Sequence, residues 1–357
     1  MIYLQINFFL CLLWSVIIKL LPLKEEMQKK VFVSLTFVQL LIVHGLCDIQ
    51  LGDLPVYEKV WNSLQYSSFS QFINSSSIIA NANISEGIEG GFIFFMRLVN
   101  FFTDNFRWFI FINSFLMLIC YYNVFFKYST NIYISVLLLL LLPFNQSLFV
   151  IRQHLSIAVL LLSYPYIINR KLYKFLLIVF IAFILHNSSL IFIPIYFLYG
   201  IKSYKKYISV VILTTVFFLF LFKYIFSLIG YNIDRYVGYT FFTSFASSIK
   251  ALTMLTILII YILFLKKEIF REGMNKLILT SSLIGILGGI FLGEMGAGRI
   301  FLIYNLCVLF QIPLTMKYIN NRLFRYVYII LALSLYFAFT FYFSTDSIYI
   351  EDYKINL

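Results

Sequence analysis

The stretch FVIRQHLSIAVLLLSYPYIINRKLYKFLLIVFIAFILHNSS, residues 149–189, places polar side chains between apolar runs that are suited to a membrane. Arg152, Gln153 and His154 stand together at the start of one run, and His186 closes the next. Polar and ionisable groups at membrane depth are costly, so each of them is a candidate for function. What they do depends on the side of the membrane that they face.

The composition of the whole chain is that of a polytopic membrane protein. Hydrophobic residues make up 62% of the 357 and charged residues 12%, whereas a soluble domain has about 25% charged residues. The first 22 residues lack a cleavage site of small residues, so we expect a retained helix. We assign the net charge of +12 to cytoplasmic loops and not to nucleic-acid binding. The four cysteines lack metal-site spacing.

The apolar runs predict an all-α fold of about 12 transmembrane or re-entrant helices (range 10–12), within a single integral membrane domain over residues 1–357. Residues 174–201 lie between two basic segments, so we expect two short helices that turn at residues 186–189. One long tilted span is the alternative. The other spans are predicted near residues 2–22, 31–47, 108–126, 131–149, 153–168, 207–229, 251–265, 277–293, 300–316 and 326–343.

The basic residues predict the orientation of these spans. With the hairpin in place, one face carries 18 of the 27 Lys and Arg residues and four of the 15 acids, a net charge of +14. The other face has a net charge of −2. Because Lys and Arg gather in cytoplasmic loops, we expect both termini, Arg152 and His186 on the outer face.

The longest loop, residues 48–106, then lies outside as a large outer loop. Its apolar patch FIFFMRLVNFF (92–102) is too short to span the bilayer and carries Arg97. We therefore expect short amphipathic helices in the outer interface. A loop of this length is typical of a binding element.

Five of the nine arginines fall on the outer side, against the usual bias of loops. A guanidinium binds phosphate oxygens in a bidentate manner, so these arginines indicate a phosphate or diphosphate ligand. The alternative is that each one snorkels or pairs with a nearby acid, which we expect for Arg107 and Arg235. We favour Arg152 and Arg299 as ligands, the latter because glycines free the backbone just before it.

The chain has three histidines. His44 is expected to be a packed polar residue. His186, at the tip of the hairpin, is a candidate general base toward a hydroxyl, or it caps the turn. His154 should point to a different helix face from Arg152. Glu294 is a rival base, because nearby arginines would keep it ionised.

Residues 149–198 resemble the EpsG-like family of bacterial exopolysaccharide and O-antigen polymerases (Wzy type). The matching pattern is an Arg-Gln that enters a small-residue helix, a basic turn, a closing His-x-Ser and a proline-containing helix with tyrosines. DLPVYEKVW (53–61) and EGIEGGF (86–92) look like elements of that family's first outer loop. GAGRIFLIY (296–304) looks like its late Arg-x4-Tyr.

The resemblance implies a GT-C-like polymerase architecture and a metal-independent, inverting glycosyltransferase without a cofactor. It would act in O-antigen, capsule or exopolysaccharide synthesis, on the periplasmic face of the bacterial inner membrane. The substrate would be an undecaprenyl-diphosphate-linked oligosaccharide, with membrane lipids, a chain-length regulator and a flippase as further partners. Arg152 and Arg299 would hold the diphosphate, and His186 or Glu294 would be the base. The supporting residues would be Gln153, His154, Tyr304, Asp53, Tyr57, Glu89 and Arg97.

Two other functions fit less well. A flippase or transporter of lipid-linked oligosaccharide should show polar groups at the bilayer midplane and internal repeats, whereas here the charges cluster at the outer mouth. A membrane acyltransferase would need a histidine within reach of a cytoplasmic donor, and all three histidines are predicted to lie outward.

Overall fold

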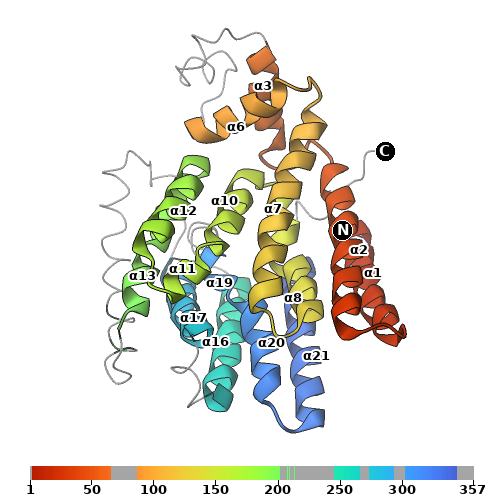
Figure 1. Ribbon diagram of the computed structural model, residues 1–357, viewed down its shortest axis with the longest axis vertical. Helices are drawn as coiled ribbons and strands as arrows, with labels where there is room; N and C mark the ends of the chain where they lie inside the picture. The colour runs from red at the N-terminus through yellow and green to blue at the C-terminus, as the bar shows by residue number, and fades with distance from the viewer. Residues whose placement is uncertain are drawn as a thin grey trace.

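The computed structural model describes residues 2–65, 87–201, 207, 209, 213, 245–265, 273–292 and 302–343, and these residues form helices without strands (Figure 1). Four helices in the described part are long and apolar enough to cross a membrane, namely Ile2–Leu20, Phe106–Tyr128, Ile151–Ile168 and Arg322–Tyr342. Shorter apolar helices accompany them. The all-α membrane class is therefore confirmed, whereas the total of about 12 helices stays a prediction.

The observed helices follow the predicted spans. Asparagine side chains cap the starts of three of them, at Asn105, Asn131 and Asn321, because a side-chain oxygen there accepts a backbone N–H that the helix leaves unpaired. The predicted span 207–229 lies almost wholly outside the described residues. The observed elements are α1 (Ile2–Leu20), α2 (Glu25–Gly45), α7 (Phe106–Tyr128), α8 (Ile132–Leu139) with η1 (Leu140–Phe144) and α9 (Asn145–Ser147), α10 (Ile151–Leu161), α11 (Tyr164–Ile168), α16 (Phe245–Leu265), α17 (Gly273–Leu292), α19 (Leu302–Asn305), α20 (Val308–Tyr318), and α21 (Arg322–Ala338) with η4 (Phe339–Phe343).

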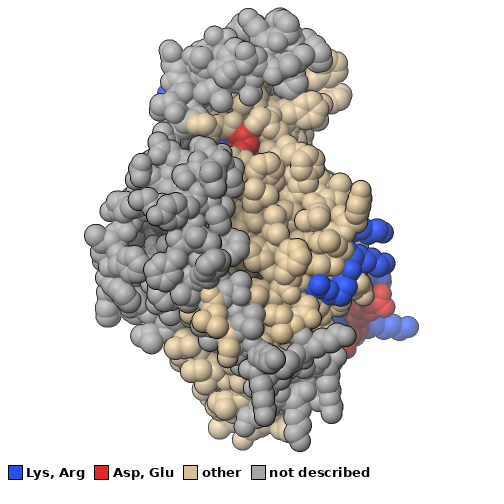
Figure 2. Space-filling view, turned by 90° about the vertical axis from the view of Figure 1, so that its left-hand side faces the viewer, with Lys and Arg blue, Asp and Glu red and all other residues tan. Residues whose placement is uncertain are grey.

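Helix α12 (Leu172–Leu185) shows which kind of surface the bundle presents. Phe175, Val179 and Ala182 are buried on one side of it, while Leu177 and Phe180 on the outside are 58% and 57% exposed. A helix that faced water would carry polar residues there. Figure 2 likewise shows that most of the described surface carries no Lys, Arg, Asp or Glu. The charged side chains form one small spot near the top and a group along the right-hand margin. Such a surface fits hydrocarbon.

The predicted hairpin is confirmed. Helix α12 ends at Leu185, His186 is extended (φ −158°, ψ 122°), and the chain returns through η2 (Asn187–Phe192) and α13 (Pro194–Tyr199). The rings of Phe175 and Tyr196 stack with centroids 5.1 Å apart. Arg170 also lies over the Tyr196 ring, 4.0 Å from its centroid. Both arms therefore end at the same level, which excludes one long span.

The basic turns lie at the end of the bundle opposite α3 (Leu54–Gln65) and α6 (Gly90–Asn100), as the α1–α2 and α20–α21 turns show in Figure 1. Lys19 at the end of α1 lies 4.7 Å from the ring centroid of Tyr133 in α8. Lys276 at the start of α17 donates to the carbonyl oxygen of Ile201 at 2.5 Å. Among the described residues the basic turns therefore gather at one end as predicted, while residues 202–206 and 266–272 lie outside the described part. The face of the membrane that this end occupies stays a prediction.

Helices α3 and α6 form a cap over the other end of the bundle (Figure 1). The Phe92 ring of α6 packs between Tyr57 of α3 and Phe109 of α7, with centroids 5.4 and 5.6 Å away. Trp61 Nε1 donates to the carbonyl oxygen of Asp104 at 2.9 Å. The described part of residues 48–106 thus contains two short helices that aromatic packing fixes on the bundle, and the position of this loop outside the membrane stays a prediction.

Candidate active site

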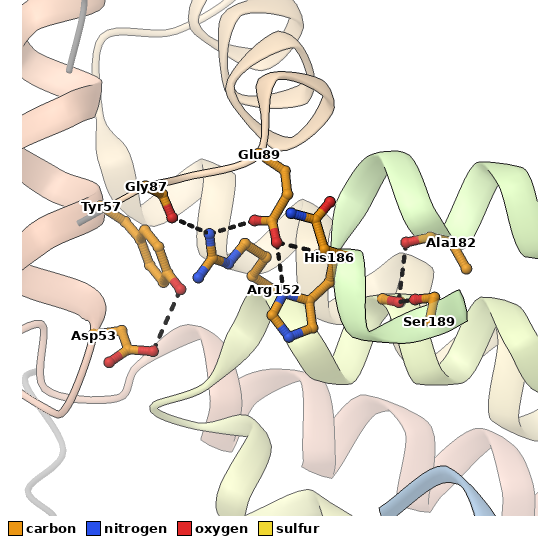
Figure 3. A network of polar contacts seen from close by, with 10 residues as sticks. Asp53, Tyr57, Gly87, Glu89, Arg152, Ala182, His186 and Ser189 are labelled. Carbon is orange, nitrogen blue, oxygen red and sulfur yellow. Dashed lines mark hydrogen bonds and ion pairs between the residues drawn. The ribbon is translucent and has the colours of Figure 1, made fainter. Parts of the chain in front are cut away.

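Glu89 lies at the centre of a polar cluster between the cap and the bundle (Figure 3). One of its carboxylate oxygens, Oε1, is 3.0 Å from Nδ1 of His186 and accepts the backbone N–H of Asn187 at 3.0 Å. The other oxygen, Oε2, forms an ion pair with Arg152. The side chains of Glu89, Arg152 and His186 are 9%, 16% and 10% exposed. Two segments that are far apart in the sequence, at Arg152 and at His186–Asn187, thus share the carboxylate of Glu89.

The position of Glu89 follows from the start of α6. Glu89 precedes the first turn of this helix, and its carbonyl oxygen accepts the backbone N–H groups of Phe92 and Ile93. A carboxylate is favoured at a helix N-terminus, where the helix dipole is positive. This first turn can approach α12 only because residue 91 is glycine, since a Cβ there would lie 2.5 Å from the carbonyl oxygen of Ile184. The close contact brings Glu89 to the tip of the hairpin.

The hairpin tip that carries His186 is fixed from α10. The Ser156 hydroxyl donates to the carbonyl oxygen of Ala182 at 3.1 Å and also bonds the hydroxyl of Ser189. The backbone N–H of His186 donates to the same Ala182 carbonyl at 2.8 Å. Ser156 lies four residues after Arg152 and therefore on the same face of α10; Ser156 contacts the hairpin, whereas Arg152 contacts Glu89.

Arg152 lies between Glu89 and the first turn of α3. Its guanidinium also donates to the carbonyl oxygen of Gly87 at 3.4 Å and lies 5.8 Å from the ring centroid of Tyr57. The Tyr57 hydroxyl donates to a carboxylate oxygen of Asp53 at 3.4 Å. Asp53, Tyr57 and Glu89 were predicted as supporting residues of the outer loop. They lie around Arg152, the residue that was predicted to hold the diphosphate.

The surroundings of Glu89 keep it ionised. Burial alone would raise the pKa of this carboxyl, but the hydrogen bond from His186, the charge of Arg152 and the Asn187 N–H outweigh burial and lower the pKa to about 2. Burial raises the pKa of the Tyr57 phenol, so this hydroxyl remains a donor. The site thus holds a guanidinium cation, a carboxylate anion and an imidazole within one small, mostly buried volume.

Other predicted residues support the structure at a distance. Arg97 in α6 donates to the carbonyl oxygen of Leu64 and so joins the two cap helices. The Tyr304 hydroxyl donates to the carbonyl oxygen of Ile191 at 2.6 Å, which holds the returning arm of the hairpin. Gln153 and His154 are buried in α10. Glu294 and Arg299 lie outside the described residues.

The sequence did not reveal that Glu89 is the shared acceptor. The family resemblance in the sequence implied only that Glu89 would be a supporting residue. The main-chain contributions of Gly87 and Asn187 were missed entirely, because any residue supplies a carbonyl or an N–H. The signals that pointed to Glu89 were the resemblance of residues 86–92 to the family's outer loop and the glycines that follow it.

Comparison with protein families gives a match to the EpsG family over residues 30–355, which includes the entire Glu89 cluster. Comparison with curated proteins and with solved structures gives no match.

Proposed function

The chain belongs to the EpsG family, and on that premise we propose that it polymerises lipid-linked oligosaccharide repeat units. In this proposal a glycan leaves undecaprenyl diphosphate and joins an acceptor sugar hydroxyl on the outer face of the bacterial inner membrane. The product would be an O-antigen, capsule or exopolysaccharide. Family membership supports a glycosyltransferase-like polysaccharide polymerase, and the particular donor, acceptor and membrane face belong to the proposal.

One observation carries the proposal, namely the meeting of Arg152 and His186 on Glu89 beneath the cap. Transfer from a diphosphate needs a cation where the leaving group gains negative charge and a base where the acceptor loses a proton. A guanidinium suits the first task because its fork matches phosphate oxygens. A neutral imidazole suits the second.

The reaction balances with these two groups. The acceptor hydroxyl gives its proton to His186 while its oxygen attacks the anomeric carbon of the donor glycan. The bond from that carbon to the diphosphate oxygen breaks, and its electron pair leaves with undecaprenyl diphosphate beside Arg152. Attack opposite the leaving group inverts the anomeric centre. The scheme uses no metal ion, and metal independence is part of the proposal.

The position of the charges favours this reaction over transport. Within the described residues, the buried ion pair lies between the cap and the ends of α10 and α12. A transporter would be expected to bind its substrate near the middle of the membrane.

The test is complementation of a strain that lacks this protein, with the glycan ladder measured per amount of membrane-inserted enzyme. We expect Arg152→Ala and His186→Gln to abolish the ladder. Arg107→Ala is the matched control, because Arg107 donates to the carbonyl oxygen of Cys47 at 3.3 Å and is not part of the cluster. Glu294→Gln tests the rival base. Full-length ladders from both Arg152→Ala and His186→Gln would overturn the proposal.

A further inference from the structure

The hydrogen bond between Glu89 and His186 has a donor and an acceptor that can be assigned. An ionised carboxylate has no proton to donate, so the proton in this 3.0 Å contact belongs to Nδ1 of His186. In a neutral imidazole with the proton on Nδ1, the lone pair is on Nε2. Figure 3 shows the second ring nitrogen on the side away from Glu89. The nitrogen that can accept a proton is therefore the one that Glu89 leaves open.

We propose that Glu89 is a positioning residue that fixes the proton of His186 on Nδ1 and directs Nε2 toward the acceptor hydroxyl. The catalytic meaning of this assignment rests on the proposed function, whereas the assignment of the proton does not. Glu89 would touch neither the donor nor the acceptor and would act through the imidazole.

A second contact makes the orientation rigid. The oxygen that binds Nδ1 also accepts the N–H of Asn187, the residue that follows His186 in the chain. Backbone and side chain at the hairpin tip are thus held by the same atom, so the ring has little freedom to turn. Carboxylate partners orient imidazoles in the same way in the Ser-His-Asp triad.

Glu89 itself is poorly suited to take the proton from the acceptor. Its two oxygens already accept hydrogen bonds from Arg152, His186 and Asn187. A carboxylate held by several donors is a weak base, because protonation would cost these bonds. Its effect on the reaction is therefore expected to pass through His186.

His44 provides an internal reference with the opposite arrangement. Its Nε2 lies 2.9 Å from the carbonyl oxygen of Ser147, and a carbonyl oxygen can only accept, so Nε2 carries the proton. Nδ1 of a neutral His44 then accepts from the Ser114 hydroxyl at 2.7 Å. The two histidines should therefore report opposite tautomers in the same sample.

The test is nitrogen NMR of the full chain in lipid nanodiscs at pH 8.5, with histidine labelled at both ring nitrogens. The signals of His186 and His44 are assigned by their loss in His186→Gln and His44→Gln. We expect His186 to be protonated on Nδ1 in the wild type and to shift toward the Nε2–H form in Glu89→Gln, because the Arg152 cation holds the amide oxygen and the amide NH2 then faces Nδ1. Glu58→Gln is the control, an acid of α3 outside the cluster, and should leave the spectrum unchanged.

Two spectra would overturn the proposal: an Nε2–H form of His186 in the wild type, or an unchanged Nδ1–H form in Glu89→Gln. Turnover gives the second measurement. We expect Glu89→Gln to lower kcat by at least about 10²-fold with a smaller change in KM, since the related Asp→Asn change in a serine protease costs about 10⁴-fold. A change in KM alone would contradict a positioning role.

The two measurements separate this inference from the proposed function. If the tautomer shifts in Glu89→Gln but the wild type makes no polymer, the assignment of the proton stands and the proposed function fails. If polymer forms and the tautomer does not shift, the proposed function stands and the positioning role of Glu89 fails.

Discussion

His44 and His186 are both buried histidines, and they differ in how many of their ring nitrogens are hydrogen-bonded. His44 is bound on both ring nitrogens, by a serine hydroxyl and a backbone carbonyl, and is 0% exposed. His186 is bound through Nδ1 to a carboxylate that also holds an arginine. A histidine with both nitrogens occupied stabilises helix packing, whereas one that is oriented through a single nitrogen has the other available for the proposed proton transfer.

The largest expected difference comes from replacing each histidine by glutamine. His186→Gln should lower polymer formation by about 10²- to 10⁴-fold, the usual contribution of a general base, and leave the protein folded. His44→Gln should instead cost about 1–3 kcal/mol of stability, because buried partners lose a hydrogen bond. The measurements are polymer per folded enzyme and thermal unfolding in nanodiscs. Equal effects of the two changes on turnover would remove the distinction.

Glu89→Ala should destabilise the protein by about 3–5 kcal/mol, because it removes the carboxylate that forms an ion pair with a mostly buried arginine. Glu58→Ala, in the same cap, should change stability by less than about 0.5 kcal/mol. Unfolding of both variants under the same conditions checks this. A small loss in Glu89→Ala would mean that the ion pair is dispensable for the cap.

Low pH should cause part of the loss of stability that is expected for Glu89→Ala. The Glu89 carboxyl has its pKa lowered from 4.5 to about 2 in the folded protein. Its contribution is therefore fully present above about pH 4.5 and is lost as the pH falls toward 2, on the order of 3 kcal/mol in total. The stability of the wild type should fall more steeply over this interval than that of Glu89→Gln. Parallel pH curves would contradict the lowered pKa.

Gly91→Ala should cost about 1–3 kcal/mol, because the added Cβ would meet Ile184 and push α6 away from α12. Polymer formation should fall as well, since the shift carries Glu89 away from His186. Gly87→Ala is the control, because a Cβ there has no neighbour within 4 Å. Equal unfolding temperatures of the two variants would show that the contact is not needed to place the cap.

Much of the fold could be predicted from the sequence because a segment that spans a membrane must be long enough and apolar enough to do so. Runs of apolar residues gave the helices, and the basic flanks of residues 174–201 gave the hairpin that Phe175 and Tyr196 confirm. The apolar patch at residues 92–102 gave α6 in the same way. These features depend on the transfer of local segments from water to hydrocarbon.

The site was predicted only in part. Polar residues at membrane depth identified Arg152 and His186, because placing them there is costly wherever the chain folds. Their shared partner was not identified, since Glu89 is 63 residues from Arg152 and 97 from His186 in the sequence. Tyr304 was expected to support the site; its hydroxyl donates to the carbonyl oxygen of Ile191 on the returning arm of the hairpin, and its role in the site stays a prediction.

The sequence by itself thus determined the class of protein, the described helices, the hairpin and the costly polar residues at membrane depth. Only the tertiary structure decided that one carboxylate joins Arg152, His186 and Asn187. The physical reason is that helix insertion depends on properties summed along a segment, whereas this cluster depends on how closely α6, α10 and α12 pack. Gly91 permits that approach, and only the neighbouring helix shows why it must be glycine.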